Sequence, residues 1–193
     1  MTKFNSDVDI DFADRNEILG LIDTVPATIV KNDKITKHNT GIYPTDIPVN
    51  PFTGTASLDY VQAEQRGYVK LDFLNVNLYK QVKNEQHLIE LMKEPNWQML
   101  YDPEICSQLI HVNGHYDTLL KMPDPVDSIP RLAMFLAIIR PGKRHLVGQP
   151  WREVAKTIWD KVDGEYSFKK SHSVAYSQLV VVNMNLIAEQ KGQ

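Results

Sequence analysis

Two short segments of the chain alternate polar and apolar residues with a period of two, and the predicted fold is built on them. Residues 7–12 read Asp-Val-Asp-Ile-Asp-Phe, and residues 69–74 read Val-Lys-Leu-Asp-Phe-Leu. This period is typical of β-strands, in which successive side chains point to opposite faces. We therefore predict two strands, each with one polar and one apolar face.

The acidic residues of these two strands are the main candidates for chemistry. If the strands are neighbours in one sheet and their apolar faces are buried together, Asp9, Asp11 and Asp72 converge at one edge of a cleft. Three close carboxylates repel each other, and a divalent cation such as Mg²⁺ relieves the repulsion. Alternating aspartates are also typical of a solvated strand face, so the pattern alone leaves both interpretations open.

Other segments show the apolar periodicity of helices or the composition of loops. We predict helices over residues 13–25, with Asp14 as the N-cap and Pro26 as the stop, and over 85–94, 131–139 and 151–162. The last helix runs to about residue 188 with Ser171 as a possible cap, although its valine-rich middle also fits a strand. Residues 31–40 and 44–54 are predicted to be turns and loops.

Length and composition are those of a globular protein. The 193 residues, 42% hydrophobic and 23% charged, predict one domain, with or without a small extension. The start of the chain resembles no signal peptide, and no segment is apolar and long enough to span a bilayer. The single cysteine, Cys106, excludes an internal disulfide and is expected to be buried. We expect a soluble, cytoplasmic protein without membrane contact.

The net charge of −3 hides an uneven distribution. Residues 1–30 hold two cations and six acids, a net −4, whereas residues 140–172 hold eight cations and four acids, a net +4. An acidic region that holds metals and a basic region that holds phosphates would suit a nucleotide or nucleic-acid substrate. Two solvated faces of opposite sign explain the distribution equally well.

The histidines and the nucleotide-binding motifs add little. His111 and His115 have a spacing that zinc can use, but they flank a predicted turn and lack a third soft ligand. The sequence contains neither a Gly-Lys-Ser/Thr phosphate loop nor a nucleophile elbow.

Five motifs, taken together, resemble landmarks of one family in the family's own order. They are Asp-Val-Asp-Ile-Asp-Phe at 7–12, Lys-His-Asn-Thr-Gly-Ile at 37–42, Gly-Tyr-Val-Lys-Leu-Asp-Phe-Leu at 67–74, Leu-Ala-Ile-Ile-Arg-Pro-Gly at 136–142 and Phe-Lys-Lys-Ser-His-Ser-Val-Ala-Tyr at 168–176. The chain is thus similar to the catalytic alpha subunit of bacterial DNA polymerase III, the C family of replicative polymerases.

The resemblance implies an α+β fold with two parts that form one compact unit. Residues 1–84 would be a nucleotidyltransferase-type palm with a small mixed β-sheet, and residues 85–193 a mainly helical, fingers-like part. Asp9, Asp11 and Asp72 match the catalytic carboxylates that bind two Mg²⁺ ions, or Mn²⁺. The matched substrate- and phosphate-binding positions are Lys70, Arg140, Lys170, Ser171, His172 and His38. For Arg140, a cation that favours a helix end is the alternative.

The chain also departs from the family. It is several times shorter, and every interval between the motifs is compressed. The glycine- and serine-rich palm element, the phosphoesterase-like domain, the clamp-binding region and the oligonucleotide-binding domain have no counterpart in it. We therefore do not expect processive synthesis by this chain alone.

The leading hypothesis is a miniature or partial C-family DNA polymerase core, of a kind natural in a bacteriophage. It would add deoxynucleotides to a primer 3′ end during DNA replication by two-metal nucleotidyl transfer, in which metals about 3.5–4 Å apart activate the attacking oxygen and stabilise the leaving oxygen. Its partners would be primer-template DNA and deoxynucleoside triphosphates, with a second chain or self-association as a possible complement. The alternative is a catalytically inactive, polymerase-derived module that binds DNA or a replisome protein.

Overall fold

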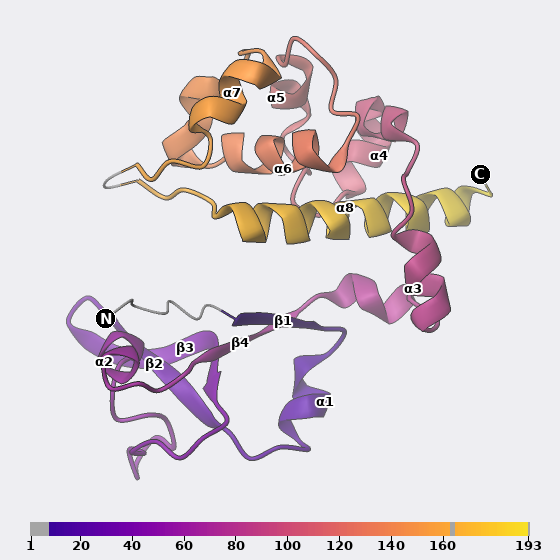
Figure 1. Ribbon diagram of the computed structural model, residues 1–193. Coiled ribbons are helices and arrows are strands. Elements are labelled where there is room, and N and C mark those ends of the chain that lie inside the picture. Colours follow the sequence, from indigo (N-terminus) through magenta and orange to yellow (C-terminus); the bar gives the residue numbers. More distant parts are fainter. Residues whose placement is uncertain (1–7, 163–164, 193) are drawn as a thin grey trace. The chain divides into compact units, whose positions relative to one another are not determined.

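The fold is α+β and divides into two compact units. The computed structural model describes residues 8–162 and 165–192, so Asp7 of the first motif lies outside the described residues. One unit ends at Val82 and the other begins at Lys83 (Figure 1). The sequence analysis placed the boundary at residue 84 and treated the two parts as one compact unit.

The first unit contains a small mixed sheet of four strands. The strands are β1 (Val8–Phe12), β2 (Val25–Lys31), β3 (Lys34–Tyr43) and β4 (Leu71–Asn75). Their order in the sheet is β1-β4-β3-β2, with β1 parallel to β4 and the other pairs antiparallel. The predicted neighbourhood of the two aspartate-bearing strands is therefore confirmed.

Short helices complete this unit. They are α1 (Arg15–Leu19), α2 (Tyr60–Gln65) and the 3-10 turn η1 (Asn77–Gln81). Asp14 caps α1 as predicted, since its side chain accepts a hydrogen bond from the backbone N–H of Asn16. The prediction of a helix up to residue 25 is wrong: Leu21 and Ile22 are exposed, and Val25 and Pro26 belong to β2. Proline is tolerated there because β2 is an edge strand.

A tight hairpin replaces the predicted turn-rich segment at residues 31–40. Asn32 and Asp33 have φ angles of 50° and 60°, and they form the turn between β2 and β3. Two successive positive φ angles are typical of the turns that match the twist of paired strands. The polar composition of residues 34–40 concealed the strand, because its outer part, residues 34–37, is exposed on both faces and needs no apolar alternation.

The second unit is helical. It contains α3 (Glu85–Leu91), η2 (Trp97–Tyr101), α4 (Pro103–Gln108), α5 (Tyr116–Leu120), α6 (Ile129–Ile138), η3 (Pro141–Leu146), α7 (Trp151–Thr157) and α8 (Lys170–Lys191). The valine-rich segment is thus a helix and not a strand. Helix α7 ends at Thr157 instead of residue 162. Lys169 stands at the N-cap position of α8, so Ser171 lies inside its first turn and does not cap it.

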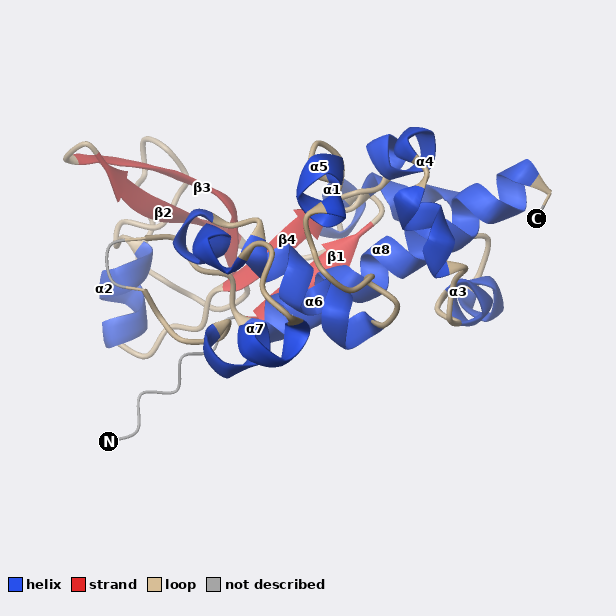
Figure 2. Ribbon diagram, turned by 90° about the horizontal axis from the view of Figure 1, so that it is seen from above, coloured by secondary structure: helices blue, strands red, loops and turns tan. Residues whose placement is uncertain are grey.

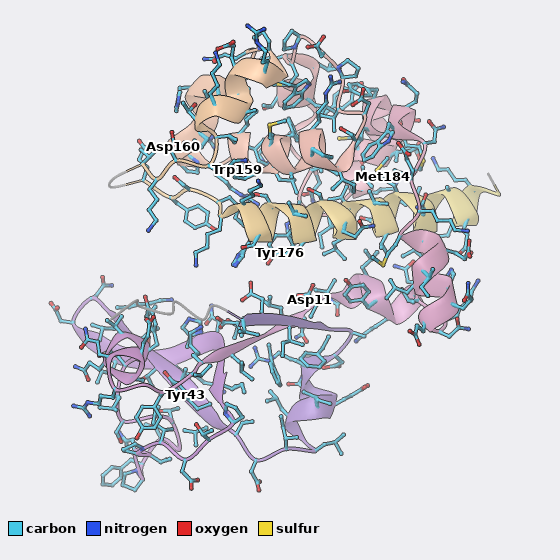
Figure 3. The ribbon with its side chains drawn as sticks, viewed as in Figure 1. Asp11, Tyr43, Trp159, Asp160, Tyr176 and Met184 are labelled. Atoms are coloured by element: carbon cyan, nitrogen blue, oxygen red, sulfur yellow. The ribbon has the colours of Figure 1, made fainter. Side chains whose placement is uncertain are left out.

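The larger hydrophobic core lies in this helical unit. Helices α6 and α8 pack against each other, and both are drawn in blue in Figure 2. Phe135 and Leu136 on α6, Met184 on α8 and Cys106 on α4 are fully buried in this core. Met184 is labelled in Figure 3. None of the helices in the described ranges is long and apolar enough to span a membrane.

Candidate active site

The pairing of β1 with β4 brings the predicted carboxylates onto adjacent strands. Asp9 is the pairing partner of Asp72, and Asp11 is the partner of Leu74. Because paired residues of parallel strands present their side chains to the same face, Asp9, Asp11 and Asp72 belong to one face of the sheet. This is the spatial relation that the sequence pattern predicted.

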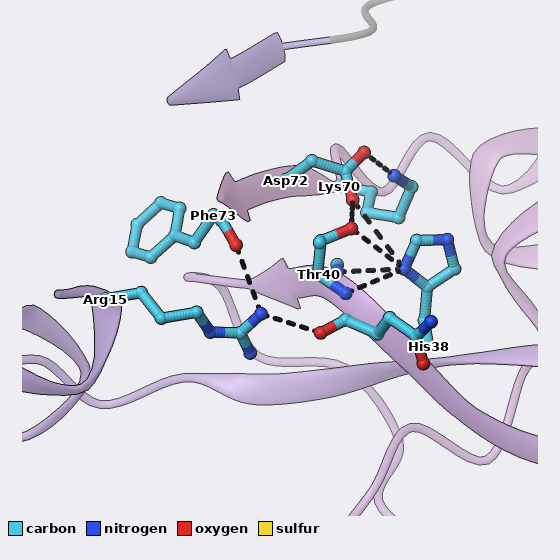
Figure 4. A network of polar contacts seen from close by, with 8 residues as sticks. Arg15, His38, Thr40, Lys70, Asp72 and Phe73 are labelled. Atoms are coloured by element: carbon cyan, nitrogen blue, oxygen red, sulfur yellow. Dashed lines mark hydrogen bonds and ion pairs between the residues drawn. The ribbon is translucent and has the colours of Figure 1, made fainter. Parts of the chain in front are cut away.

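The side chain of Asp72 is the centre of a polar network in the sheet unit (Figure 4). Asp72 is only 8% exposed. Its Oδ1 atom accepts a 2.7 Å hydrogen bond from the Thr40 hydroxyl, and its Oδ2 atom forms an ion pair with the ammonium group of Lys70. The carboxylate therefore points into polar groups and not into the apolar core.

His38 adjoins this network in its neutral form. Its Nδ1 atom accepts hydrogen bonds from the backbone N–H groups of Gly41, at 2.9 Å, and Thr40, at 3.3 Å. Nδ1 therefore carries a lone pair, and the ring proton is on Nε2. Desolvation, followed by the charge of Lys70, lowers the pKa of His38, against the opposing effect of Asp72. The 3.6 Å approach of Nδ1 to Asp72 Oδ1 is thus no ion pair at neutral pH.

Gly41 makes room for this arrangement. A Cβ atom at this position would lie 2.8 Å from Lys70 Cδ, 2.9 Å from His38 Nδ1 and 3.1 Å from Ala27 Cβ. The pairing of β2 with β3 is irregular next to it, with Thr28 opposite Lys37 but Pro26 opposite Ile42. Such irregularities redirect side chains. Here they allow His38 and Thr40 to reach Asp72.

Arg15 is a residue of this region that the sequence analysis missed. Its guanidinium donates hydrogen bonds to the backbone carbonyl of Asn39 on β3, at 2.6 Å, and to that of Phe73 on β4, at 3.1 Å. It thus links two neighbouring strands close to Asp72 (Figure 4). Thr40 was also missed as a functional candidate, although it lies within the motif at residues 37–42.

The other two carboxylates are on the edge strand β1 and are exposed. Partial desolvation and then the negative charge of Asp9 raise the pKa of Asp11. The expectation of a buried apolar face on this strand is wrong, since Val8 and Ile10 are exposed. Only Phe12 packs inward, with its ring 4.7 Å from that of Phe73.

The donor set fits a divalent cation in part. Asp9 and Asp11 offer hard oxygen ligands. Desolvation first, and then the negative charge of Asp9, raises the pKa of Asp11, and a cation would relieve the second effect. Asp72, in contrast, is engaged by Lys70. Across residues 8–162 and 165–192, no three side chains among His, Cys, Asp and Glu are grouped to hold a metal ion. Asp72 would join Asp9 and Asp11 at a cation only by exchanging its lysine partner.

The predicted phosphate-binding residues outside the sheet unit lie in the helical unit. Arg140 follows α6, and its guanidinium lies 4.8 Å from the ring centre of Phe168. Its Nε atom is buried without a hydrogen-bond partner among the described residues. The rings of Phe168 and Tyr176 are stacked at 5.4 Å. The structure therefore joins the motifs at 136–142 and 168–176.

The charge of Arg140 affects two nearby histidines, His111 and His115. Desolvation lowers the pKa of both His111 and His115, and Arg140 lowers each further. His172 approaches the Phe168 ring edge-on at 6.0 Å. Lys170 and Ser171 are exposed in the first turn of α8, where backbone N–H groups lack intrahelical acceptors. This group of residues forms a cationic, aromatic surface at a helix start.

Comparisons with protein-family models, with curated proteins and with solved structures found no match to this chain.

Proposed function

We propose that the protein is a compact nucleotidyltransferase of the C-family DNA polymerase type, acting on primer-template DNA and deoxynucleoside triphosphates. The observation that carries the proposal is the pairing of Asp9 with Asp72 on adjacent parallel strands, with Asp11 on the same face. In this proposal the sheet unit is the palm and the helical unit the fingers. Mg²⁺ bound by Asp9, Asp11 and Asp72 would supply activation of the attacking hydroxyl and stabilisation of the leaving oxygen.

The residues around Asp72 have separate roles in this proposal. Lys70 holds the Asp72 carboxylate in place and, when a cation takes over that carboxylate, is released toward substrate phosphates as a point charge. Neutral His38 presents its Nε2–H as a hydrogen-bond donor for a phosphate oxygen. Arg15 and Gly41 position the network without touching the substrate.

The cationic surface of the helical unit supports a second part of the proposal. Arg140, whose buried Nε atom has no hydrogen-bond partner in the described part of the chain, would gain bidentate partners from a triphosphate. Lys170 and Ser171 would add charge and backbone donors at the start of α8, and His172 a ring next to Phe168. A triphosphate would offset the positive charge of Arg140, which adds to desolvation in lowering the pKa of His111 and His115.

Primer extension tests this proposal directly. The purified protein is mixed with a primed template, deoxynucleotides and Mg²⁺, beside Asp11→Asn, Asp72→Asn and the control Asp23→Asn. Asp23 is an exposed acid of the same unit outside β1 and β4, so its loss removes the same charge elsewhere. We expect extension by the parent and the control but not by the two site variants. Extension by Asp72→Asn at the parental rate would contradict the proposal.

Calorimetry with Mg²⁺ or Mn²⁺ gives an independent readout of the carboxylates. We expect the parent and Asp23→Asn to bind the ion and both site variants to lose binding, because each supplies one hard oxygen ligand. A parent that shows no heat of binding would contradict the metal role.

One observation favours a second candidate function, a non-catalytic module that binds DNA or a replisome protein. The ion pair of Lys70 with Asp72 already neutralises the third carboxylate without a metal. In that case the parent would bind DNA without extending it, and Asp11→Asn and Asp72→Asn would leave the binding unchanged.

A further inference from the structure

The hairpin of β2 and β3 extends beyond the sheet as a two-stranded ribbon. β4 pairs with β3 only at Gly41 and Ile42, whereas β2 pairs with β3 from Lys31 opposite Lys34 onward. Residues 31–37 are exposed throughout. Figure 2 shows β2 and β3 running on past β4 toward their connecting turn. The outer part of the hairpin therefore lacks cover on either face from residues 8–82, the described part of its own unit.

The ribbon presents cations and apolar side chains together. Lys31 and Lys34 are direct cross-strand partners, and Lys37 is the partner of Thr28. The cross-strand pair Val30 and Ile35 lies between them. Val30 is 49% exposed and Ile35 is 60% exposed. Because side chains alternate along each strand, Lys37 shares a face with Val30 and Ile35, whereas Lys31 and Lys34 are on the opposite face.

This arrangement is unfavourable in the protein alone. Like charges directly opposite each other destabilise a strand pair, and two-stranded hairpins are marginal in water. None of the three lysines forms an ion pair with another described residue. Asp33 in the turn is the one acid among residues 28–41. A partner with closely spaced negative charges would offset this repulsion.

We propose that this ribbon, residues 28–37, is a docking surface for the phosphate backbone of duplex DNA. The inference rests on the proposed function and deepens it, because it names the element that holds the duplex part of a primer-template. The major groove admits a two-stranded β-ribbon and has phosphates along both sides. Lysines on both faces of the ribbon match that arrangement, and the exposed Val30 and Ile35 can contact sugars and thymine methyl groups.

The ribbon also continues from the polar network of Asp72. Lys31 is close enough to His38 for its charge to lower the pKa of that histidine. A duplex on the ribbon would therefore have one end near Lys70 and His38. A short acidic peptide would satisfy the lysines too, but it would gain nothing from lysines on two opposite faces.

The test is the salt dependence of duplex binding by the full chain, measured by fluorescence anisotropy with a labelled 20-base-pair DNA and EDTA present. The variant carries Lys31→Ala, Lys34→Ala and Lys37→Ala. Its control carries Lys93→Ala, Lys121→Ala and Lys191→Ala, three exposed lysines of the helical unit. We expect the slope of log K against log salt to become less steep by about 2 to 3 in the ribbon variant alone, since each phosphate contact contributes close to 1.

A rescue variant and the outcomes that would contradict the inference complete the test. A variant with three Lys→Arg changes at the same positions should keep the parental slope, which separates charge from folding defects. An unchanged slope in the alanine variant, or equal losses in the ribbon and control variants, overturns the inference, as does binding of an acidic peptide but not of DNA. Binding is measured with EDTA present and without extension, so it does not depend on polymerase activity. If the parent does not extend a primer but the alanine variant still loses duplex binding, the proposed function is refuted and the inference stands.

Discussion

The two units of this protein differ in what stabilises them. The helical unit buries a large continuous set of apolar side chains, centred on α6 and α8. The sheet unit has a small cluster made of Ala27, Tyr43, Ile47, Ala56 and Ala63. Its strands β3 and β4 are also joined by side-chain hydrogen bonds, from Thr40 to Asp72 and from Arg15 to backbone carbonyls of both strands. The comparison teaches that the unit with the candidate chemistry is the one with the weaker apolar core.

Tyr43 illustrates this division. Its ring is buried in the small cluster, while its hydroxyl lacks a hydrogen-bond partner among the described residues. Desolvation and then the charges of Asp59, Asp72 and Glu64 raise its pKa to about 12. Burying an unpaired hydroxyl costs stability. In the sheet unit, few apolar contacts are present to offset this loss of stability.

The largest expected effect is in the core of the helical unit. Phe135→Ala removes a fully buried ring, and we expect it to lower the free energy of unfolding by about 3–5 kcal/mol. Ile10→Ala on the exposed edge strand β1 is the control and should cost under about 1 kcal/mol. Urea denaturation followed by circular dichroism measures both. Equal losses would show that the apolar contrast between the units is unimportant.

Next in size is the ion pair of the sheet unit. Lys70→Met leaves the carboxylate of Asp72 with Thr40 as its remaining close partner, and we expect a loss of about 2 kcal/mol. Asp72→Asn in the Lys70→Met background should recover part of that loss, because the buried negative charge is then absent. A double-mutant cycle gives the coupling energy. A coupling near zero would mean that the pair does not stabilise the sheet.

A smaller effect is expected at Gly41. Gly41→Ala places a methyl group against Lys70 and His38, and the flexible lysine stem can yield, so we expect a loss on the order of 1 kcal/mol. Gly20→Ala is the matched control, because its Cβ would meet only ordinary contacts at 3.5 Å. Thermal melts of both variants provide the measurement. A neutral Gly41→Ala would show that the network tolerates displacement.

The smallest effect is the pH dependence of His38. Its pKa in the folded state is below the ordinary 6.5, so the unfolded chain binds the proton more readily. The stability contribution is therefore complete above pH 6.5 and falls as the pH drops from 6.5 toward the folded-state value. NMR titration of the His38 ring should show the lowered pKa. A value above 6.5 would instead mean that Nδ1 is protonated and paired with Asp72.

His111 and His115 provide the counterpart in the other unit. Both have lowered pKa values, so the helical unit also loses stability on acidification below pH 6.5. His38→Gln should remove only the contribution of the sheet unit. Urea denaturation at several pH values below 6.5 then measures the pH dependence of the free energy of unfolding that remains, which we assign to the histidines of the helical unit.

The sequence predicted those features that depend on local periodicity. The alternation in residues 7–12 and 69–74 predicted β1 and β4, and the apolar period of 131–139 predicted α6, because these patterns follow from strand and helix geometry. The adjacency of Asp9 and Asp72 was also predicted, with help from the resemblance. The polar strand β3 was missed, and the helix that begins after Asp14 was predicted to run to residue 25, because strand pairing and not local pattern determines where β2 begins and where β3 runs.

Side-chain partners were less accessible to the sequence. Lys70 was predicted beside the third carboxylate, but its ion pair with Asp72 depends on the space that Gly41 leaves. Arg15 could not be identified, because its acceptors are backbone carbonyls of two other strands. Every residue has a backbone carbonyl, so the sequence does not indicate which one a side chain will bind. Arg140 and Phe168 were both within predicted motifs, yet their contact requires the packing of α6 on α8.

The position of the one cysteine has a practical consequence. Cys106 is sealed inside the helical unit, and burial raises the pKa of its thiol, so both access and thiolate formation oppose alkylation. A maleimide dye would then react only when that unit opens, whatever happens around Asp72. The rate of labelling, followed by mass spectrometry, therefore measures how often the helical unit opens, and no engineered probe is needed.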